Sequence, residues 1–242
     1  MRVLVVTAVP VERDAVTRAF GGPEEHVALP GAELHRRGGF DVLAGGAGPA
    51  AAAAATAFAL ASGASASGAS ASAPYGLVVS AGIGGAFTPV TPLGSLIVAD
   101  GIVAADLGAE TADGFLPVTA LGFGRDRFTP PPALVRAVAA ATGAVAGPVL
   151  TVSTVTGSAE RAGALLAAHP GALAEAMEGF GVAEAAARAD VPVLEVRAVS
   201  NAVGPRDRDA WRIGDALAAL TDAFGKAAPV LQGWNSHEDL EG

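Results

Sequence analysis

Cysteine is absent from this sequence of 242 residues, which excludes disulfide bonds, thiolate zinc sites and iron–sulfur clusters. Histidine is scarce, and the few histidines lie far apart in the sequence. No two of them stand four residues apart, as they would on one face of a helix. The four positions are His26, His35, His169 and His237. We therefore expect no metal site, and no other motif indicates a cofactor.

Positive charge is also in short supply. The chain has 15 Lys and Arg residues against 24 Asp and Glu, a formal net charge of −9 and a pI near 4.8. Binding to a phosphate backbone needs clustered basic side chains, so we expect no nucleic-acid partner.

Long apolar runs are missing as well. The alanine-rich stretch 50–61 falls well short of the roughly 20 apolar residues that span a bilayer. The apolar run 2–7 is too short for the core of a signal peptide. We expect a cytoplasmic protein with no membrane partner.

Hydrophobic residues make up 51% of the chain, enough to bury a substantial core. We expect one domain over residues 1–234, followed by a polar tail over 235–242. Residues 61–74 contain only Ala, Ser, Gly and a final Pro, which is typical of a flexible surface loop. A linker between domains is the less favoured interpretation of that segment.

Short β-branched runs alternate with alanine-rich segments along the chain. The runs predict strands at 2–7, 40–44, 76–81, 95–99, 148–153 and 192–199. The segments predict helices at 10–20, 49–62, 131–142, 158–168, 173–189 and 213–225. The strands lack polar alternation, so both of their faces should be buried. This pattern favours an α/β fold: a three-layer α/β/α sandwich around a mixed, largely parallel sheet.

Two glycine-rich segments follow predicted strands, at 44–49 and 80–85. Glycine accepts positive φ and lets a ligand approach backbone amides, and ligands bind at the carboxyl ends of parallel strands. A tight structural turn explains either segment equally well. Neither is a complete dinucleotide fingerprint.

Two carboxylates stand near these elements. Glu12 follows the first predicted strand at the start of a helix, where it could simply complement the helix dipole. Glu178 lies in an apolar stretch, so its carboxylate needs partners, and the hydroxyl pair of a ligand is one possible set.

The last predicted strand is apolar at its start and ends in Arg197, Ser200 and Asn201. Polar side chains at the carboxyl end of a strand are typical of a ligand site. A strand that emerges into solvent, with Asn201 in a turn, is the alternative.

Taken in order, these elements resemble the nucleoside phosphorylase/nucleosidase superfamily over residues 2–225. The most specific parts are Met177-Glu178 and the Arg-x-x-Ser-Asn run 197–201. Segments 106–110, 177–181 and 200–207 are most similar to the futalosine hydrolase family. The resemblance implies an enzyme of menaquinone biosynthesis that hydrolyses the N-glycosidic bond of futalosine, releasing hypoxanthine and dehypoxanthine futalosine. It also implies a homo-oligomer, at least a dimer.

The resemblance assigns a role to each matching residue. Glu12 would be the general base that activates water, with Arg197 beside that water. Glu178 would hold the two ribose hydroxyls, and Met177 would pack on the sugar. The backbone around Gly82, Ile83 and Val155 would line the base.

Three departures from the superfamily pattern carry information. Related adenosine-type nucleosidases have an aspartate where this chain has Asn201, whose amide suits a 6-oxopurine such as hypoxanthine. Bacterial phosphorylases have a phosphate-binding arginine where residues 77–80 contain none, which favours hydrolysis. Thr154 stands where relatives stack a phenylalanine on the purine. Another aromatic could take that place, and the candidates are Phe123, Phe128 and Phe180.

Residues 105–130 would cover the 5′ end of the substrate, which in futalosine carries a benzoate. Arg125 or Arg127 could pair with that carboxylate, although solvated loop charges explain either arginine better.

Other functions stay open. A methylthioadenosine/S-adenosylhomocysteine nucleosidase and a purine nucleoside phosphorylase are the nearest alternatives. A dinucleotide-binding oxidoreductase and a non-catalytic nucleoside-binding protein are more distant ones.

Overall fold

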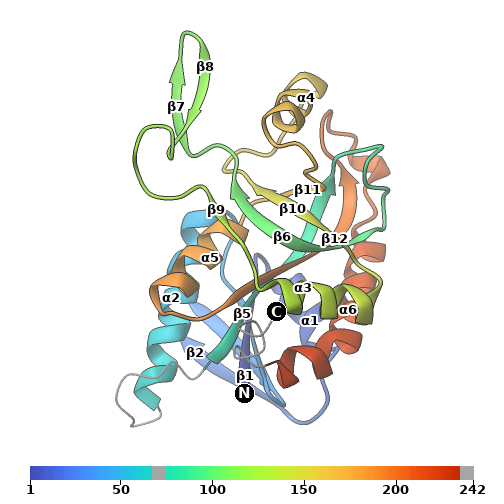
Figure 1. Ribbon diagram of the computed structural model, residues 1–242. Coiled ribbons are helices and arrows are strands. Elements are labelled where there is room, and N and C mark those ends of the chain that lie inside the picture. The colour runs from blue at the N-terminus through green and yellow to red at the C-terminus, as the bar shows by residue number, and fades with distance from the viewer. Residues whose placement is uncertain (67–74, 235–242) are drawn as a thin grey trace.

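A mixed sheet of ten strands runs through the structure, a computed structural model that describes residues 1–66 and 75–234 (Figure 1). The strand order is β11-β10-β6-β12-β5-β1-β4-β3-β2, with β9 paired to β6. These strands are β1 (Arg2–Thr7), β2 (Glu24–Leu29), β3 (Ala32–Arg37), β4 (Phe40–Ala44), β5 (Tyr75–Ala86), β6 (Leu96–Ala104), β9 (Arg127–Phe128), β10 (Val145–Thr151), β11 (Ala174–Ala176) and β12 (Val193–Ala202). A separate hairpin is formed by β7 (Gly108–Thr111) and β8 (Gly114–Pro117).

The central strands β4, β1, β5 and β12 are parallel to one another, as are β6, β10 and β11. Antiparallel pairs join β12 to β6 and β11 to β5. The pairings β5–β12–β6–β10–β11–β5 therefore form a closed circuit of five strands at one end of the sheet. The expected mixed, largely parallel sheet is confirmed.

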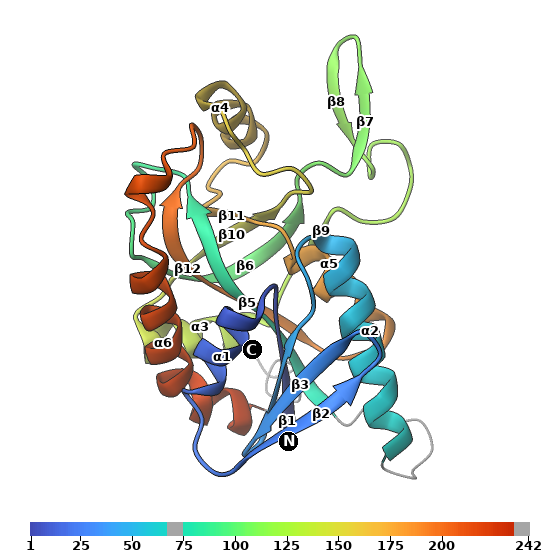
Figure 2. The ribbon, with the colours of Figure 1, turned by 180° about the vertical axis from the view of Figure 1, so that it is seen from behind.

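Helices cover both faces of the sheet (Figures 1 and 2). The helices are α1 (Pro10–Thr17), α2 (Pro49–Ala66), α3 (Pro132–Thr142), α4 (Ala159–Ala168), α5 (Gly179–Arg188) and α6 (Ile213–Gly233). A short 3-10 helix spans Arg208–Ala210.

Strand β1 shows how one segment serves two cores. Val3 and Val5 pack with α1, α3 and α6, whereas Leu4 and Val6 pack with α2 and α5. Alternate side chains of a strand point to opposite faces, so a continuous apolar run is what a strand buried on both faces requires. The three-layer arrangement expected from the sequence is confirmed. No helix in the described part of the chain is long and apolar enough to cross a membrane.

Several predicted boundaries were wrong, and the largest error concerns residues 80–85. This glycine segment is not a turn, because β5 continues through it to Ala86. Its backbone is paired with β12 from Ser80 to Gly85, and at Gly85 also with β11. Glycine is needed at positions 84 and 85 because the neighbouring chain lies close. A Cβ on Gly84 would lie 3.0 Å from the carbonyl oxygen of Glu175, and one on Gly85 would lie 3.0 Å from the side chain of Val203.

Other corrections are local. The predicted helix 173–189 begins with the short strand β11, and only then does α5 start. Helix α2 continues to Ala66, so residues 61–66 are helical rather than loop, in line with the high helix propensity of alanine. The charged hairpin of β2 and β3 was not predicted. The remainder of the expected loop, 67–74, and the expected tail, 235–242, lie outside the described residues.

Candidate active site

A cavity of about 260 Å³ opens where the carboxyl ends of β1, β5 and β12 meet. Parallel strands end at the same edge of a sheet, so the polar residues that follow them converge there. The lining residues are Ala8, Val9, Glu12, Ala47, Ile83, Gly84, Gly85, Val155, Thr156, Glu175, Ala176, Met177, Glu178, Ser200, Asn201, Val203 and Trp211.

Glu12 is held in the first turn of α1 and is almost fully buried. One of its oxygens accepts hydrogen bonds from the backbone N–H groups of Ala8 (3.0 Å) and Val9 (3.3 Å), and the other accepts from Ile83 (2.9 Å). Burial raises the pKa of Glu12 above 4.5, and these backbone donors together with Arg197 oppose the rise. A carboxylate with a raised pKa is a stronger base toward water than an exposed one.

Glu178 immediately precedes α5 and faces the glycine turn after β4. Its Oε1 accepts a hydrogen bond from the N–H of Gly48 (3.2 Å), a residue with φ of 90°. Positive φ is accessible to glycine without strain, which explains the glycine at this turn. The other oxygen, Oε2, lies 3.3 Å from Nη1 of Arg197.

Arg197 has no solvent exposure and lies beneath the cavity. Its Nε donates to Oε1 of Glu195 (2.9 Å) and its Nη2 donates to Oγ of Ser80 (3.0 Å). Nη1 makes no hydrogen bond. A Cβ on Gly82 would lie 2.6 Å from this Nη1 and 2.7 Å from Oε1 of Glu12. The guanidinium and the Glu12 carboxylate therefore both border the space above Gly82.

Asn201, near the end of β12, also lines the cavity. Oγ of Ser200 donates a 2.8 Å hydrogen bond to its Oδ1, and its Nδ2 donates to the carbonyl of Ala202 (2.9 Å). An amide group has two donors and two acceptor lone pairs, so one N–H and one lone pair remain for a ligand.

The structure brings most of the predicted site residues together. Glu12, Glu178 and Asn201 open onto the same cavity, which Ile83, Val155 and Met177 also line. Gly82 and Arg197 lie just below it and contact Glu12 or Glu178.

The position of Phe180 does not agree with the predicted role in substrate binding, because its side chain does not line the cavity. It is buried in the core on α5, where its ring lies 5.2 Å from that of Phe128. Phe123, the third stacking candidate, is 68% exposed and also lies outside the cavity lining. Trp211 is the aromatic residue that lines the cavity.

Arg125 and Arg127 are exposed and pair with neighbouring acids. Arg125 lies 4.0 Å from Glu184, and Arg127 lies 3.8 Å from Asp100. These contacts fit the interpretation of solvated loop charges.

Two buried glutamates were missed by the sequence reasoning. Both oxygens of Glu175 accept from Thr156, from its N–H at 2.9 Å and its hydroxyl at 2.5 Å. Glu195 has no solvent exposure at all. Burial raises the pKa of both carboxyls. A charged residue within an otherwise apolar strand is the signal that could have revealed each of them.

Two of the histidines, although separated in the sequence, lie side by side in the structure. The β2–β3 hairpin sets His26 opposite His35, and their rings stack at 4.1 Å. One oxygen of Glu24 lies 3.1 Å from a nitrogen of His26 and 3.2 Å from one of His35. Ligand atoms of these three residues lie within 4.8 Å of one another, which makes them a group that could hold a metal ion, a possibility that the sequence did not indicate. None of these three residues lines the cavity described above.

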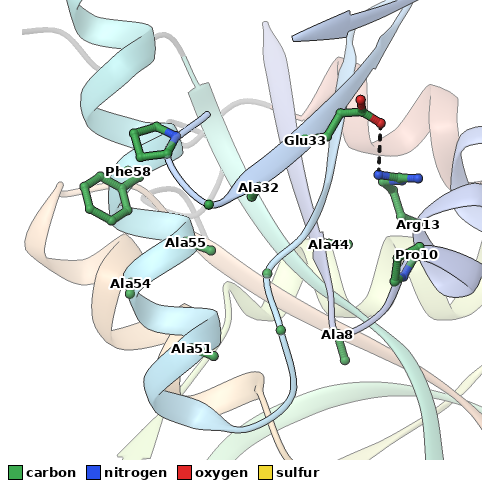
Figure 3. Close-up of a pocket in the computed structure, with 14 residues that line it drawn as sticks. Ala8, Pro10, Arg13, Ala32, Glu33, Ala44, Ala51, Ala54, Ala55 and Phe58 are labelled. Carbon is green, nitrogen blue, oxygen red and sulfur yellow. Dashed lines mark hydrogen bonds and ion pairs between the residues drawn. The ribbon is translucent and has the colours of Figure 1, made fainter. Parts of the chain in front are cut away.

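A second pocket, of about 450 Å³, lies between α2 and the β2–β3 hairpin (Figure 3). Its walls are mainly Ala, Gly and Pro residues together with Phe58, and Arg13 and Glu33 face each other on one side at 3.4 Å. It shares only Ala8 with the smaller cavity. Although larger, it lacks the converging acids and amide that chemistry on a nucleoside needs.

Comparison with known proteins decides the family. Residues 7–231 match the family model described as the phosphorylase superfamily. The chain is 67% identical to a futalosine hydrolase of Streptomyces coelicolor, over 98% of this chain and 100% of that protein. It is 42% identical to a futalosine hydrolase of Acidothermus cellulolyticus, over 91% of this chain and 88% of that protein.

The chain belongs to the futalosine hydrolase family of the phosphorylase superfamily. This membership confirms the resemblance found in the motifs and the expected class of enzyme, an N-glycosidic nucleosidase. Solved structures agree on the fold. The 5′-methylthioadenosine/S-adenosylhomocysteine nucleosidase of Neisseria meningitidis superposes with a TM-score of 0.79 at 18% identity, covering 95% of this chain and 99% of that one.

Proposed function

We propose that this protein hydrolyses the N-glycosidic bond of futalosine and releases hypoxanthine and dehypoxanthine futalosine. The observation that carries the proposal is the convergence of Glu12, Glu178 and Asn201 on one cavity. These two acids and the neutral amide are the groups to which the superfamily resemblance assigns the water, the ribose and the 6-oxopurine. The names of the close relatives supply the substrate.

In the proposed reaction, a water molecule lies between Glu12 and Nη1 of Arg197, which makes no hydrogen bond and is ion-paired with Glu178. Glu12 takes one proton from the water while the water oxygen bonds to C1′ of the ribose. The bond from C1′ to the purine nitrogen breaks, and its electron pair leaves with the base, which then takes a proton from solvent. A positioned base of this kind contributes about 10²–10⁴-fold to the rate.

Glu178 is proposed to accept hydrogen bonds from both ribose hydroxyls. Its negative charge also favours the positive charge that develops on the sugar as the bond breaks. The hydrogen bond from Gly48 and the ion pair with Arg197 keep this carboxylate in a fixed orientation.

Asn201 is proposed to read the base. Its free N–H can donate to O6 or N7 of hypoxanthine, and its Oδ1 can accept from a ring N–H. A 6-aminopurine presents a donor at position 6, so one buried polar group would lack a partner. Such mismatches discriminate strongly between substrates.

Water rather than phosphate is the proposed nucleophile. Within the described part of the chain, Arg197 is the cation beneath the cavity, and it is already paired with Glu195 and Glu178. A phosphate dianion at that position would meet these carboxylates and Glu12, and residues 77–80 supply no further cation.

We also propose that the protein is a homo-oligomer. The β7–β8 hairpin projects away from the body of the molecule in both views (Figures 1 and 2). Phe115, Leu116 and nearby Leu107 each expose more than 40% of their surface there. Light scattering coupled to size-exclusion chromatography tests this directly, and a monomer would contradict it.

The deciding experiment is chromatographic detection of free base from futalosine, aminodeoxyfutalosine, inosine and methylthioadenosine, each with and without phosphate. We expect hypoxanthine from futalosine at a rate that phosphate leaves unchanged. Strict dependence on phosphate would contradict hydrolysis. Adenine from methylthioadenosine as the preferred reaction would instead support the nucleosidase activity named for the structural neighbours.

A further inference from the structure

A fully buried carboxylate, that of Glu195, lies behind the cavity rather than in its wall. It stands on β12 two residues before Arg197, so both side chains point to the same face of the strand. Its Oε1 accepts the Nε–H of Arg197 at 2.9 Å, and its Oε2 has no hydrogen-bond partner. An uncompensated buried carboxylate oxygen is costly, so a purely structural role explains this residue poorly.

The first residue of α5 makes space for this carboxylate. A Cβ on Gly179 would overlap both oxygens of Glu195. Both oxygens therefore lie against the beginning of a ten-residue helix, where the partial positive charge of the backbone favours an anion.

The guanidinium of Arg197 has different neighbours on its two sides. On one side, Glu195 and Ser80 accept its Nε–H and one Nη2–H. On the other side, Nη1 lies 3.3 Å from Glu178 and close to Glu12 above Gly82. The first side anchors the group, and the second faces the reacting atoms of the proposed mechanism.

We infer that Glu195 is a positioning residue that fixes the Arg197 guanidinium and balances its charge, so that Glu12 remains an effective base. This inference rests on the proposed function. It assigns Glu195 to the same reaction although its side chain does not line the substrate cavity.

The charges around Arg197 predict how the loss of Glu195 would change the pKa of Glu12. The ionisable groups that face one another here are Glu12 on α1, Glu178 before α5, and Glu195 and Arg197 on β12. When Glu195 is ionised, its negative charge offsets much of the electrostatic effect of the Arg197 charge on Glu12. With Glu195 neutral, the full charge of Arg197 stabilises the Glu12 carboxylate and weakens it as a base.

The test is the pH profile of kcat/KM for futalosine with Glu195→Gln. Glutamine keeps an oxygen that can accept from Nε of Arg197 but carries no charge. We expect the acidic limb of the profile to move down by about one pH unit, since Glu12 holds its proton less tightly. We expect kcat on the plateau to fall about tenfold, since the base is weaker.

Three further variants separate charge from anchoring. Ser80→Ala removes the second anchor of Arg197 and leaves every charge in place, so kcat should fall while the acidic limb stays. Glu195→Asp keeps the charge but shortens the reach, and the same result is expected. Asp41→Asn is the control, because it removes a buried carboxyl that lies outside the cavity and bonds to Arg36 and Tyr75, and it should leave the acidic limb where it is.

A Glu195→Gln protein with the wild-type pH profile and kcat would overturn the inference. If circular dichroism shows that this variant does not fold, the two anchoring variants, Ser80→Ala and Glu195→Asp, decide. Unchanged kcat in both Ser80→Ala and Glu195→Asp would then overturn it. A wild-type protein that releases no free base overturns the proposed function itself, and this inference with it.

Discussion

The hydroxyl of Ser200 donates a 2.8 Å hydrogen bond to Oδ1 of Asn201. Ser200 is buried and also contacts the carbonyl of Gly84, so it is held in place by β5. The amide of Asn201 is therefore presented to the cavity in one orientation, with its donor and its acceptor at fixed positions.

Asn201→Asp should move substrate preference toward 6-aminopurine nucleosides. A protonated aspartic acid can give its proton to the departing base, whereas the amide can only share a hydrogen bond. We expect the ratio of kcat/KM for futalosine over aminodeoxyfutalosine to fall at least tenfold, the equivalent of about 1.4 kcal/mol. Ser200→Ala, which frees the amide to rotate, should lower the ratio less. An unaltered ratio in Asn201→Asp would rule out Asn201 as the reader of the base.

Glu12→Gln should abolish turnover while binding persists. Loss of a general base lowers kcat by about 10²–10⁴-fold. In the wild type, burial raises the pKa of Glu12 above 4.5, and the base must be deprotonated. Activity should therefore fall as the pH drops through that raised pKa, so the acidic limb should lie above pH 4.5. Calorimetric binding of substrate to the variant and a kinetic pH profile test both points, with the exposed Glu25→Gln as control. Equal loss of binding and turnover would contradict the assignment.

Trp211 should report on substrate binding. It lines the cavity, whereas the other tryptophan, Trp234, is buried in the core beside α6. Futalosine should change the intrinsic fluorescence of the wild type and of Trp234→Phe. Trp211→Phe should not respond. A response that survives in Trp211→Phe would place the ligand elsewhere.

Glu175→Gln should remove a loss of stability that the wild type shows as the pH rises toward neutral. The folded-state pKa of Glu175 is raised by burial, so the folded state binds its proton more tightly than the unfolded chain does. The stabilisation linked to that proton is present at low pH and is lost as the pH rises from about 4.5 through the folded pKa. Thermal unfolding of both proteins between pH 4 and 8 should show the difference in Tm growing in favour of the variant as pH rises. A difference that is independent of pH would mean that Glu175 titrates alike in the folded and unfolded states.

Phe180→Ala should affect stability much more than catalysis. Truncating a buried phenylalanine typically lowers the free energy of unfolding by about 3–5 kcal/mol. Phe123→Ala is the matched control, because that ring is 68% exposed and should change stability by no more than about 0.5 kcal/mol. Denaturant unfolding and KM for futalosine, measured below the unfolding transition, test this. A large rise in KM for Phe180→Ala would contradict this and would indicate that the Phe180 ring contacts the substrate.

The sequence predicts best where the local pattern is unambiguous. The runs at 2–7 and 40–44 became β1 and β4 with the predicted bounds, because a short run rich in β-branched and other apolar residues is typical of a buried strand. Glu12 and Asn201 could be nominated because they follow or end predicted strands, and Glu178 because it is a carboxylate within an apolar stretch. Their meeting in one cavity then depends on parallel strands ending at the same edge.

The failures arise where distant segments decide the conformation. Residues 80–85 contain the glycines typical of a turn, yet pairing with β11 and β12 makes them a strand. The hairpin of β2 and β3 is exposed and charged, so its strands lack an apolar signal. Glu195 was passed over because nothing in its neighbourhood of the sequence shows that Ser80, over a hundred residues away, anchors the same guanidinium.

The continuation of β5 through its glycines leaves the site with a floor of bare main chain. Where a wall is made of peptide groups, its shape cannot be adjusted by exchanging one side chain for another. A Cβ at Gly82 would push apart Glu12 and Arg197, and one at Gly85 would push Asn201. Variation in what this scaffold accepts must therefore arise on the flanking strands β11 and β12 and the loops beyond them, so directed evolution toward new nucleosides should begin there.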